Sequence, residues 1–201
     1  MLDQQAQLNR SYRLSLIGVC LAFVVIALGA FTRLSDAGLG CPDWPGCYGH
    51  LMWPESADEK QIAELNFPDA KVDTEKTWPE MVHRYFAGAL GLLILGLAIF
   101  SWQQSRSNNR IPLKLPLALL VLVVLQAAFG MWTVTLKLLP QVVTAHLLGG
   151  FTTLSLLWLM CLRLKHRMAV APMVSGSGPR TLAVLVLAAV IIQITLGGWT
   201  S

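Results

Sequence analysis

Five stretches of the sequence, each 19 to 25 residues long, contain no Asp, Glu, Lys or Arg. They cover residues 14–32, 85–105, 115–136, 138–162 and 181–201. A helix needs about 20 apolar residues to cross the hydrocarbon core of a bilayer, and these stretches do not show the polar stripe of helices in soluble domains. Only 13% of the residues are charged, whereas soluble domains carry about 25%. The sequence therefore predicts an all-α, polytopic membrane protein with five transmembrane helices, and it argues against a nucleic-acid partner.

The charges are divided unequally between the two ends of these stretches. Nine of the fifteen Lys and Arg residues lie on one side with a single acid, Asp3, whereas loop 34–79 on the other side holds nine acids and three lysines. The nine are Arg10, Arg13, Arg106, Arg110, Lys114, Arg163, Lys165, Arg167 and Arg180. By the positive-inside rule, the N-terminus is cytoplasmic and loop 34–79 is periplasmic or extracellular. No cleavable signal peptide is recognisable, so a bacterial inner membrane is the expected location.

Two of the four cysteines lie in loop 34–79, called the outer loop below. Cys41 and Cys47 stand in segment 40–47, which contains two prolines and two glycines, so closing the short ring between them costs little chain entropy. A structural disulfide is predicted on this side of the membrane. An exchangeable, redox-active pair is the alternative. Metal ligation with the nearby His50 is disfavoured, because these three residues do not complete a zinc ligand set.

The outer loop also carries a helix start signal. Ser56 followed by Glu59 has the spacing of a capping box, and Ile62 and Leu65 follow at helical spacing. We expect a short amphipathic helix here, on the membrane surface.

Two histidines lie inside apolar stretches. His83 and His146 each fall near the start of a span that enters from outside, so two parallel helices would hold the imidazoles at one depth. Small residues lie beside each histidine: Ala87 follows His83 by four positions with Gly88 next, and Gly149 and Gly150 follow His146 by three and four. On a helix they would leave room for a flat macrocycle. Neutral imidazole is a common axial ligand of haem iron. The alternative is helix packing, with each histidine hydrogen-bonded across an interface.

Two charged residues flank His83. Glu80, three residues earlier, is either the capping-box acid of a helix beginning near Thr77 or a functional acid beside a membrane-embedded site; the two roles are compatible. Arg84 is expected to pair with Glu80, to bind a haem propionate, or to anchor the helix at the interface.

A short motif recurs at the ends of three spans. Gly29, Phe31 and Thr32 end the first, and Gly197, Trp199 and Thr200 end the fifth. The third aligns with the fifth through Gln126–Gln193, Gly130–Gly197, Trp132–Trp199 and Thr133–Thr200. Interfacial aromatic anchoring also produces such a match. The pattern predicts a four-helix repeat that begins again at the fifth span.

Together, segments 31–45, 80–84 and 144–147 resemble the haem A synthase family of membrane oxidoreductases. That resemblance implies two similar four-helix bundles and an enzyme that converts haem O to haem A by oxidising a ring methyl to a formyl group, for cytochrome oxidase assembly. On this basis residues 1–165 are the first bundle, 166–180 a cytoplasmic linker, and 181–201 the first helix of an incomplete second bundle. The chain is then the N-terminal portion of such an enzyme.

The resemblance also implies roles for individual residues. His83 and His146 are the haem-iron ligands of the first bundle, Glu80 is the essential acid, and Cys41 and Cys47 form the outer-loop disulfide. A second histidine pair, beyond this chain, would hold a haem B cofactor, leaving the first pair for haem O. Expected partners are membrane lipid, haem O synthase, an electron acceptor and a second copy of the protein.

Two other functions fit the same residues. A b-type cytochrome that only carries electrons would also use paired histidines at matched depth. A quinone-linked thiol oxidoreductase would use Cys41 and Cys47, with the histidines structural.

Overall fold

The computed structural model describes residues 2–106, 111–168 and 178–200. The helices are α1 (Leu2–Leu34), α2 (Ala57–Asn66), α3 (Thr74–Ser105), α4 (Lys114–Thr135), α5 (Pro140–Met168) and α6 (Gly178–Thr200). All except α2 are long and apolar enough to cross a membrane, and no strand occurs among the described residues. The prediction of an all-α chain with five spans is confirmed. Arg110 and the central part of the expected linker, 169–177, lie outside the described residues.

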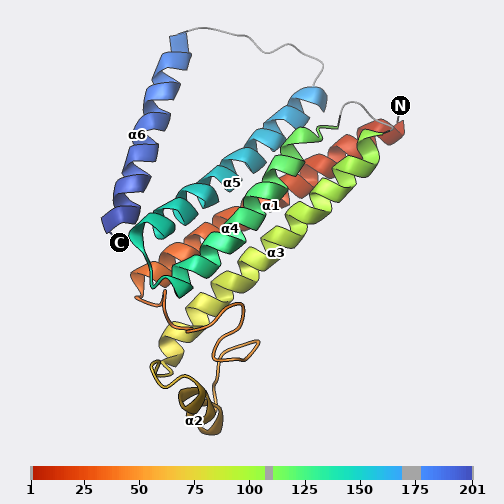
Figure 1. Ribbon diagram of the computed structural model, residues 1–201. Helices are drawn as coiled ribbons and strands as arrows, with labels where there is room; N and C mark the ends of the chain where they lie inside the picture. The colour runs from red at the N-terminus through yellow and green to blue at the C-terminus, as the bar shows by residue number, and fades with distance from the viewer. Residues whose placement is uncertain (1, 107–110, 169–177, 201) are drawn as a thin grey trace.

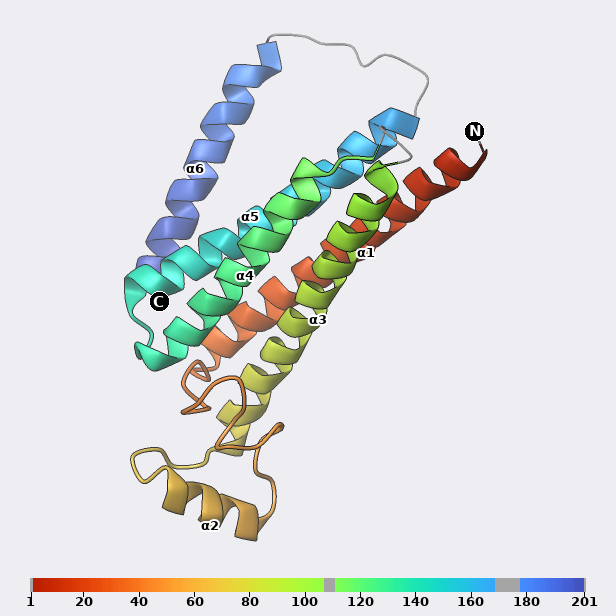
Figure 2. The same ribbon diagram turned by 45° about the vertical axis from the view of Figure 1, so that its right-hand side comes forward.

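Four of the helices form an antiparallel bundle (Figures 1 and 2). They pack in the closed order α1–α3–α4–α5, with α5 against α1. Helices α3 and α5 are therefore diagonal to each other and run in the same direction. The fifth span, α6, packs against α5 and leans away from the other helices (Figure 1). This is the predicted four-helix bundle with an additional span.

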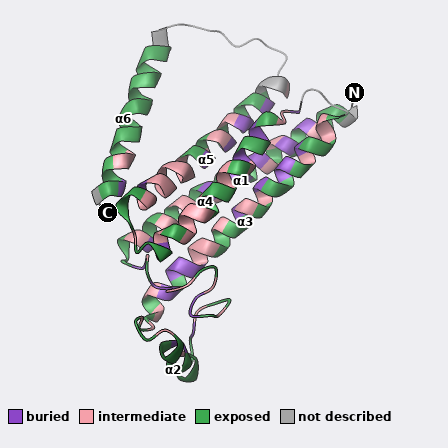
Figure 3. Cartoon of the chain, in the orientation of Figure 1, coloured by how far each residue is buried: buried purple, intermediate pink, exposed green. Residues whose placement is uncertain are grey.

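The apolar core of the bundle lies in the half nearer the N-terminus. It includes Leu97 of α3, Leu119 of α4, and Leu157 and Met160 of α5, each at most 1% exposed. Lipid is as apolar as these side chains, so the core stabilises the bundle through van der Waals packing rather than through removal from water. The outward-facing side chains are largely exposed (Figure 3), as expected for a surface that contacts lipid. The predicted histidines lie outside this core, nearer the outer loop.

Helix α3 begins earlier than the sequence pattern suggested. Its N-cap is Asp73, whose carboxylate accepts a hydrogen bond from Glu75 N at 3.0 Å. The hypothesis that Glu80 caps a helix starting near Thr77 is therefore wrong. Pro79 lies inside the helix, and the Thr32 hydroxyl donates to its carbonyl at 3.3 Å, which joins the C-terminal end of α1 to the N-terminal end of α3.

The outer loop folds beyond the end of the bundle (Figure 2). Ser56 and Glu59 form the predicted capping box at the start of α2, with both reciprocal hydrogen bonds present. Ala63 is the buried residue of α2, whereas Ile62 and Leu65 are exposed. Ala63 belongs to a second apolar cluster, which connects the loop to α3 and comprises Cys41, Cys47, Tyr48, Ala63 and Met81.

Candidate functional site

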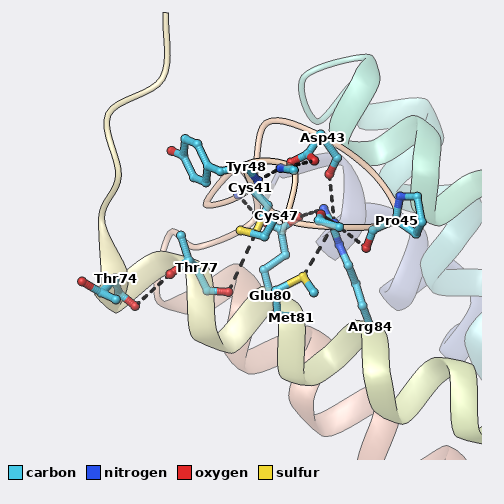
Figure 4. The surroundings of a disulfide bond; sticks show 12 residues. Cys41, Asp43, Pro45, Cys47, Tyr48, Thr74, Thr77, Glu80, Met81 and Arg84 are labelled. Carbon is cyan, nitrogen blue, oxygen red and sulfur yellow. Dashed lines mark hydrogen bonds and ion pairs between the residues drawn. A yellow bond between two sulfur atoms is a disulfide. The ribbon is translucent and has the colours of Figure 1, made fainter. Parts of the chain in front are cut away.

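The outer loop is closed by a disulfide between Cys41 and Cys47 (Figure 4). Both cysteines are 0% exposed. The Asp43 carboxylate organises the ring by accepting hydrogen bonds from Tyr48 N at 2.6 Å and Gly49 N at 2.9 Å. His50 exchanges two backbone hydrogen bonds with Cys47, at 2.9 and 3.0 Å. Within the described chain, no cluster of three or more His, Cys, Asp or Glu residues is arranged to hold a metal ion.

Glu80 connects this ring to α3. Its side chain points from the helix toward the disulfide (Figure 4), and the residue is only 4% exposed. One carboxylate oxygen accepts a hydrogen bond from Cys41 N at 2.9 Å, and the other forms an ion pair with Arg84 one turn later. A buried carboxylate requires such compensation, because removing a charge from water costs several kcal/mol, as an order of magnitude.

Arg84 completes the connection between loop and helix. Its guanidinium donates to the Asp43 carbonyl at 2.9 Å, to the Pro45 carbonyl at 3.3 Å, and to the Gly46 carbonyl. It also pairs with Glu80, which is one of the three roles expected from the sequence. Glu80 and Arg84 thus hold the disulfide ring over the outer end of α3.

His83 turns toward α1. Its Nδ1 lies 3.1 Å from the Val25 carbonyl, and its ring lies against Gly29, where a Cβ atom would come within 2.9 Å of Cε1. A carbonyl only accepts hydrogen bonds, so the neutral ring carries its proton on Nδ1. The lone pair of Nε2 is then available to a metal ion.

His146 occupies the equivalent place on α5. Its ring faces Gly130 of α4, where a Cβ atom would lie 3.5 Å from Cε1. Gly29 and Gly130 each lie five residues before the last residue of their helix, Leu34 and Thr135. The structure thus brings the two histidines to one level of the bundle from diagonal helices.

The small residues beside the histidines do not all leave space. A Cβ atom at Gly149 would lie 1.7 Å from the side-chain nitrogen of Gln126, so this amide fills the position that we expected to remain open. Gly88 does face open space. Sequence reasoning noted Gln126, Gly29 and Gly130 only as part of the repeated motif and missed their contacts with the histidine helices. The sequence signal that could have indicated these contacts was the position of the three residues near equivalent ends of their spans.

The model of the family COX15-CtaA, described as cytochrome oxidase assembly protein, matches residues 12–201. The chain belongs to this family. Among its curated relatives, a protein of Shewanella oneidensis named "Heme A synthase" is 50% identical over 188 residues. That match covers 92% of this chain and 56% of the relative. No solved structure matches the chain.

More distant relatives carry the same name. The "Heme A synthase" of a Chelativorans species is 31% identical, with 98% of this chain and 59% of the relative covered. That of Allorhizobium ampelinum is 29% identical, with 98% and 58% covered. The chain therefore spans a little over half the length of the relatives that it matches. The resemblance noted from segments 31–45, 80–84 and 144–147 is confirmed at the level of the family.

The donor set of this COX15-CtaA chain restricts the chemistry that it can support. Two imidazoles from diagonal helices provide two nitrogen ligands, which is the number that six-coordinate haem iron takes from a protein. Structural zinc takes four protein ligands and catalytic zinc takes three. A haem-type macrocycle therefore fits these residues better than a bare divalent ion.

Proposed function

We propose that this chain is the first haem-binding bundle, with the following helix, of a haem A synthase. The observation that carries the proposal is the placement of His83 and His146 at one level on diagonal helices, with Glu80 one turn from His83. The named relatives support the same function. In this proposal residues 1–165 form the bundle, 166–180 the cytoplasmic linker, and 181–201 begin a second bundle that holds haem B.

The residues that would hold a haem fit that role. Nε2 of His83 is left free by the hydrogen bond at Nδ1, and Nδ1 of His146 is buried with no hydrogen-bond partner. Both are neutral donors suited to iron. When bound, the haem supplies the redox-active iron and, as haem O, the methyl group to be oxidised. The chain orients the macrocycle and shields it from water between α3 and α5.

The overall reaction sets requirements for partners. Written with water as oxygen donor, R–CH₃ + H₂O gives R–CHO with release of four electrons and four protons. An electron acceptor and a route for protons are therefore needed, and haem O synthase would supply the substrate. The electron acceptor is expected in the same membrane, with the N-terminus cytoplasmic and loop 34–79 outside.

Glu80 is the group best placed to handle protons or positive charge beside the macrocycle. It is the buried carboxylate nearest His83 in sequence on α3, and it is held in one orientation by Cys41 N and Arg84. A carboxylate fixed in this way can accept a proton or stabilise developing positive charge. Arg84 has its donors committed to Glu80 and the loop. Binding a haem propionate would require it to exchange one of these contacts.

The thiol oxidoreductase alternative is disfavoured by burial. Exchange with a partner thiol needs access to a sulfur atom, and both Cys41 and Cys47 are 0% exposed. The b-type cytochrome alternative shares the histidine pair and is separated from the proposal by its product.

The test uses Glu80→Gln in the protein expressed from its complete coding sequence, in cells that make haem O. We expect haem to remain bound and the formyl-bearing haem to disappear from the extracted pigment. Glu75→Gln is the matched control, because Glu75 is an exposed acid of the same helix, and it should leave haem A at the parental level. Normal haem A in Glu80→Gln would refute the role of Glu80. Absence of any formyl haem from the parent would favour the electron carrier.

A further inference from the structure

A glycine in α1 determines how His83 meets that helix. In an α-helix each Cβ atom tilts toward the N-terminus, so a side chain covers the turn before its own Cα. A side chain at position 29 would therefore cover the turn that contains the Val25 carbonyl. With glycine there, the imidazole of His83 reaches that carbonyl at 3.1 Å. A Cβ atom would approach Cε1 to 2.9 Å, so the ring would have to move.

The same arrangement occurs in α4. Gly130 lies against the ring of His146, as Gly29 lies against the ring of His83. Nδ1 of His146 nevertheless has no hydrogen-bond partner. The contact at Gly130 is looser, since a Cβ atom would lie 3.5 Å from Cε1. Each histidine ring thus lies against a glycine of a neighbouring helix, and the contact at Gly29 is closer than the contact at Gly130.

The bundle consequently consists of two similar hairpins. In each, one helix carries the glycine five residues before its last residue, and a neighbouring helix of opposite direction carries the histidine: α1 with α3, and α4 with α5. The connections differ greatly, spanning 35–73 in the first hairpin and 136–139 in the second. The geometry at the histidines is retained although the loops are not. In α3, by contrast, Gly88 and Gly96 face open space, so close contact with a ring is not general to glycines in this chain.

We infer that Gly29 and Gly130 are positioning residues that seat the imidazoles of His83 and His146 against a helix backbone, with Val25 fixing the His83 tautomer through its carbonyl. The inference rests on the proposed function, because it assumes that these histidines bind iron. A backbone acceptor at Nδ1 increases the basicity of a ligating imidazole and fixes its ring plane. Because His83 makes the closer contact with a helix backbone, its imidazole is the more strongly electron-donating ligand of the two.

The test compares Gly29→Ala, Gly130→Ala and the control Gly96→Ala in the complete protein with bound haem. The readouts are haem content, the low-spin ferric electron paramagnetic resonance spectrum, and the midpoint potential. Gly29→Ala should shift the spectrum and raise the potential, because the imidazole loses its backbone acceptor, or should lower haem content. Gly130→Ala should give a smaller shift, and Gly96→Ala, in open space, none.

Two results are decisive against the inference. Parental spectra and potentials in both Gly29→Ala and Gly130→Ala, with haem retained, would overturn it. If Gly29→Ala does not accumulate, Gly130→Ala decides alone, and a parental spectrum and potential in that variant would overturn the inference. Gly130→Ala should accumulate, because its added methyl makes only an ordinary van der Waals contact with the His146 ring. Failure of the proposed function is distinguishable: His83→Ala and His146→Ala would then leave the haem spectrum of the parent unchanged, whatever the glycine variants do.

Discussion

The contact between Glu80 and Arg84 should control how firmly the disulfide ring is held on α3. Only 13% of the Arg84 side chain and 6% of the Glu80 side chain are exposed. Removing one member of a buried ion pair typically costs about 3–5 kcal/mol. Arg84→Met also removes the donor to the Asp43 and Gly46 carbonyls. The change therefore leaves a buried carboxylate held by hydrogen bonds from the loop backbone, including Cys41 N at 2.9 Å, with no cation paired to it.

The rate at which a reductant opens the Cys41–Cys47 disulfide measures this effect. Both sulfur atoms are buried, so reduction requires local opening of the loop, and when reclosing is fast the rate reports the open population. Since about 1.4 kcal/mol is a factor of ten, Arg84→Met should accelerate reduction by at least about 100-fold. Glu80→Gln keeps an acceptor for Cys41 N and loses the charge, worth about 1.5–3 kcal/mol, or roughly 10- to 100-fold.

The double variant provides the decisive comparison. Each single change removes the same ion pair, so the two effects should not add. The rate in the double variant should fall at least about tenfold below the product of the two single accelerations. The control is Lys76→Met, which breaks the exposed pair with Asp36 at 2.7 Å and should alter the rate less than about twofold. Strictly multiplicative rates in the double variant would refute the coupling.

Three further predictions concern the outer loop. Gly40→Ala should destabilise the docking of the loop by about 1–3 kcal/mol, because its Cβ would come within 2.3 Å of a main-chain oxygen of α3. The disulfide should then be reduced faster than in the control Gly88→Ala, whose Cβ would face open space. Equal reduction rates in the two variants would contradict this packing. Burial raises the pKa of Tyr48 above 10.0, so the stability that it contributes is present below pH 10 and is lost as pH rises through the folded-state pKa. Phenolate absorbance should show one late-titrating tyrosine that is missing in Tyr48→Phe. Identical titration curves for the parent and Tyr48→Phe at high pH would contradict this. Hydrogen bonds from the Ser56 backbone, the Glu55 backbone and the Ser56 side chain lower the pKa of Glu59 below 4.5. The stabilisation of α2 by Glu59 is therefore present above pH 4.5 and is lost as pH falls through the folded-state pKa. Ser56→Ala should raise the pKa of Glu59 in a carboxyl titration by nuclear magnetic resonance, and an unchanged pKa would count against the capping box.

Much of the fold was predictable from local signals. Five charge-free stretches gave five spans, and Ser56 and Glu59 gave the start of α2, because span length and capping depend on nearby residues only. The start of α3 was misplaced because Thr77 to Glu80 imitates a capping box. The actual cap, Asp73 before Glu75, was equally visible in the sequence. Thr77 to Glu80 was preferred as the helix start because it lies nearer the apolar stretch 85–105 than Asp73 does.

Apart from the pair between Glu80 and Arg84, which lie one helical turn apart, the partners of the site residues could not be predicted from the sequence. His83, His146 and Glu80 were identifiable as ionisable groups in an apolar context, and their common level follows from span direction. That Glu80 accepts from Cys41 N, and that His83 reaches the Val25 carbonyl, depends on how α1 and the outer loop pack on α3. Such contacts join residues about 40 to 60 positions apart, and no local pattern encodes them.

The central claim is that His83 and His146 bind the same haem iron. Low-spin ferric electron paramagnetic resonance of the complete protein, compared with His83→Ala and His146→Ala, tests it most directly. A bis-histidine signal present in the parent should be lost in both variants, because either substitution removes one of the two axial ligands. Persistence of the full parental signals in either variant, at parental haem content, would contradict the claim.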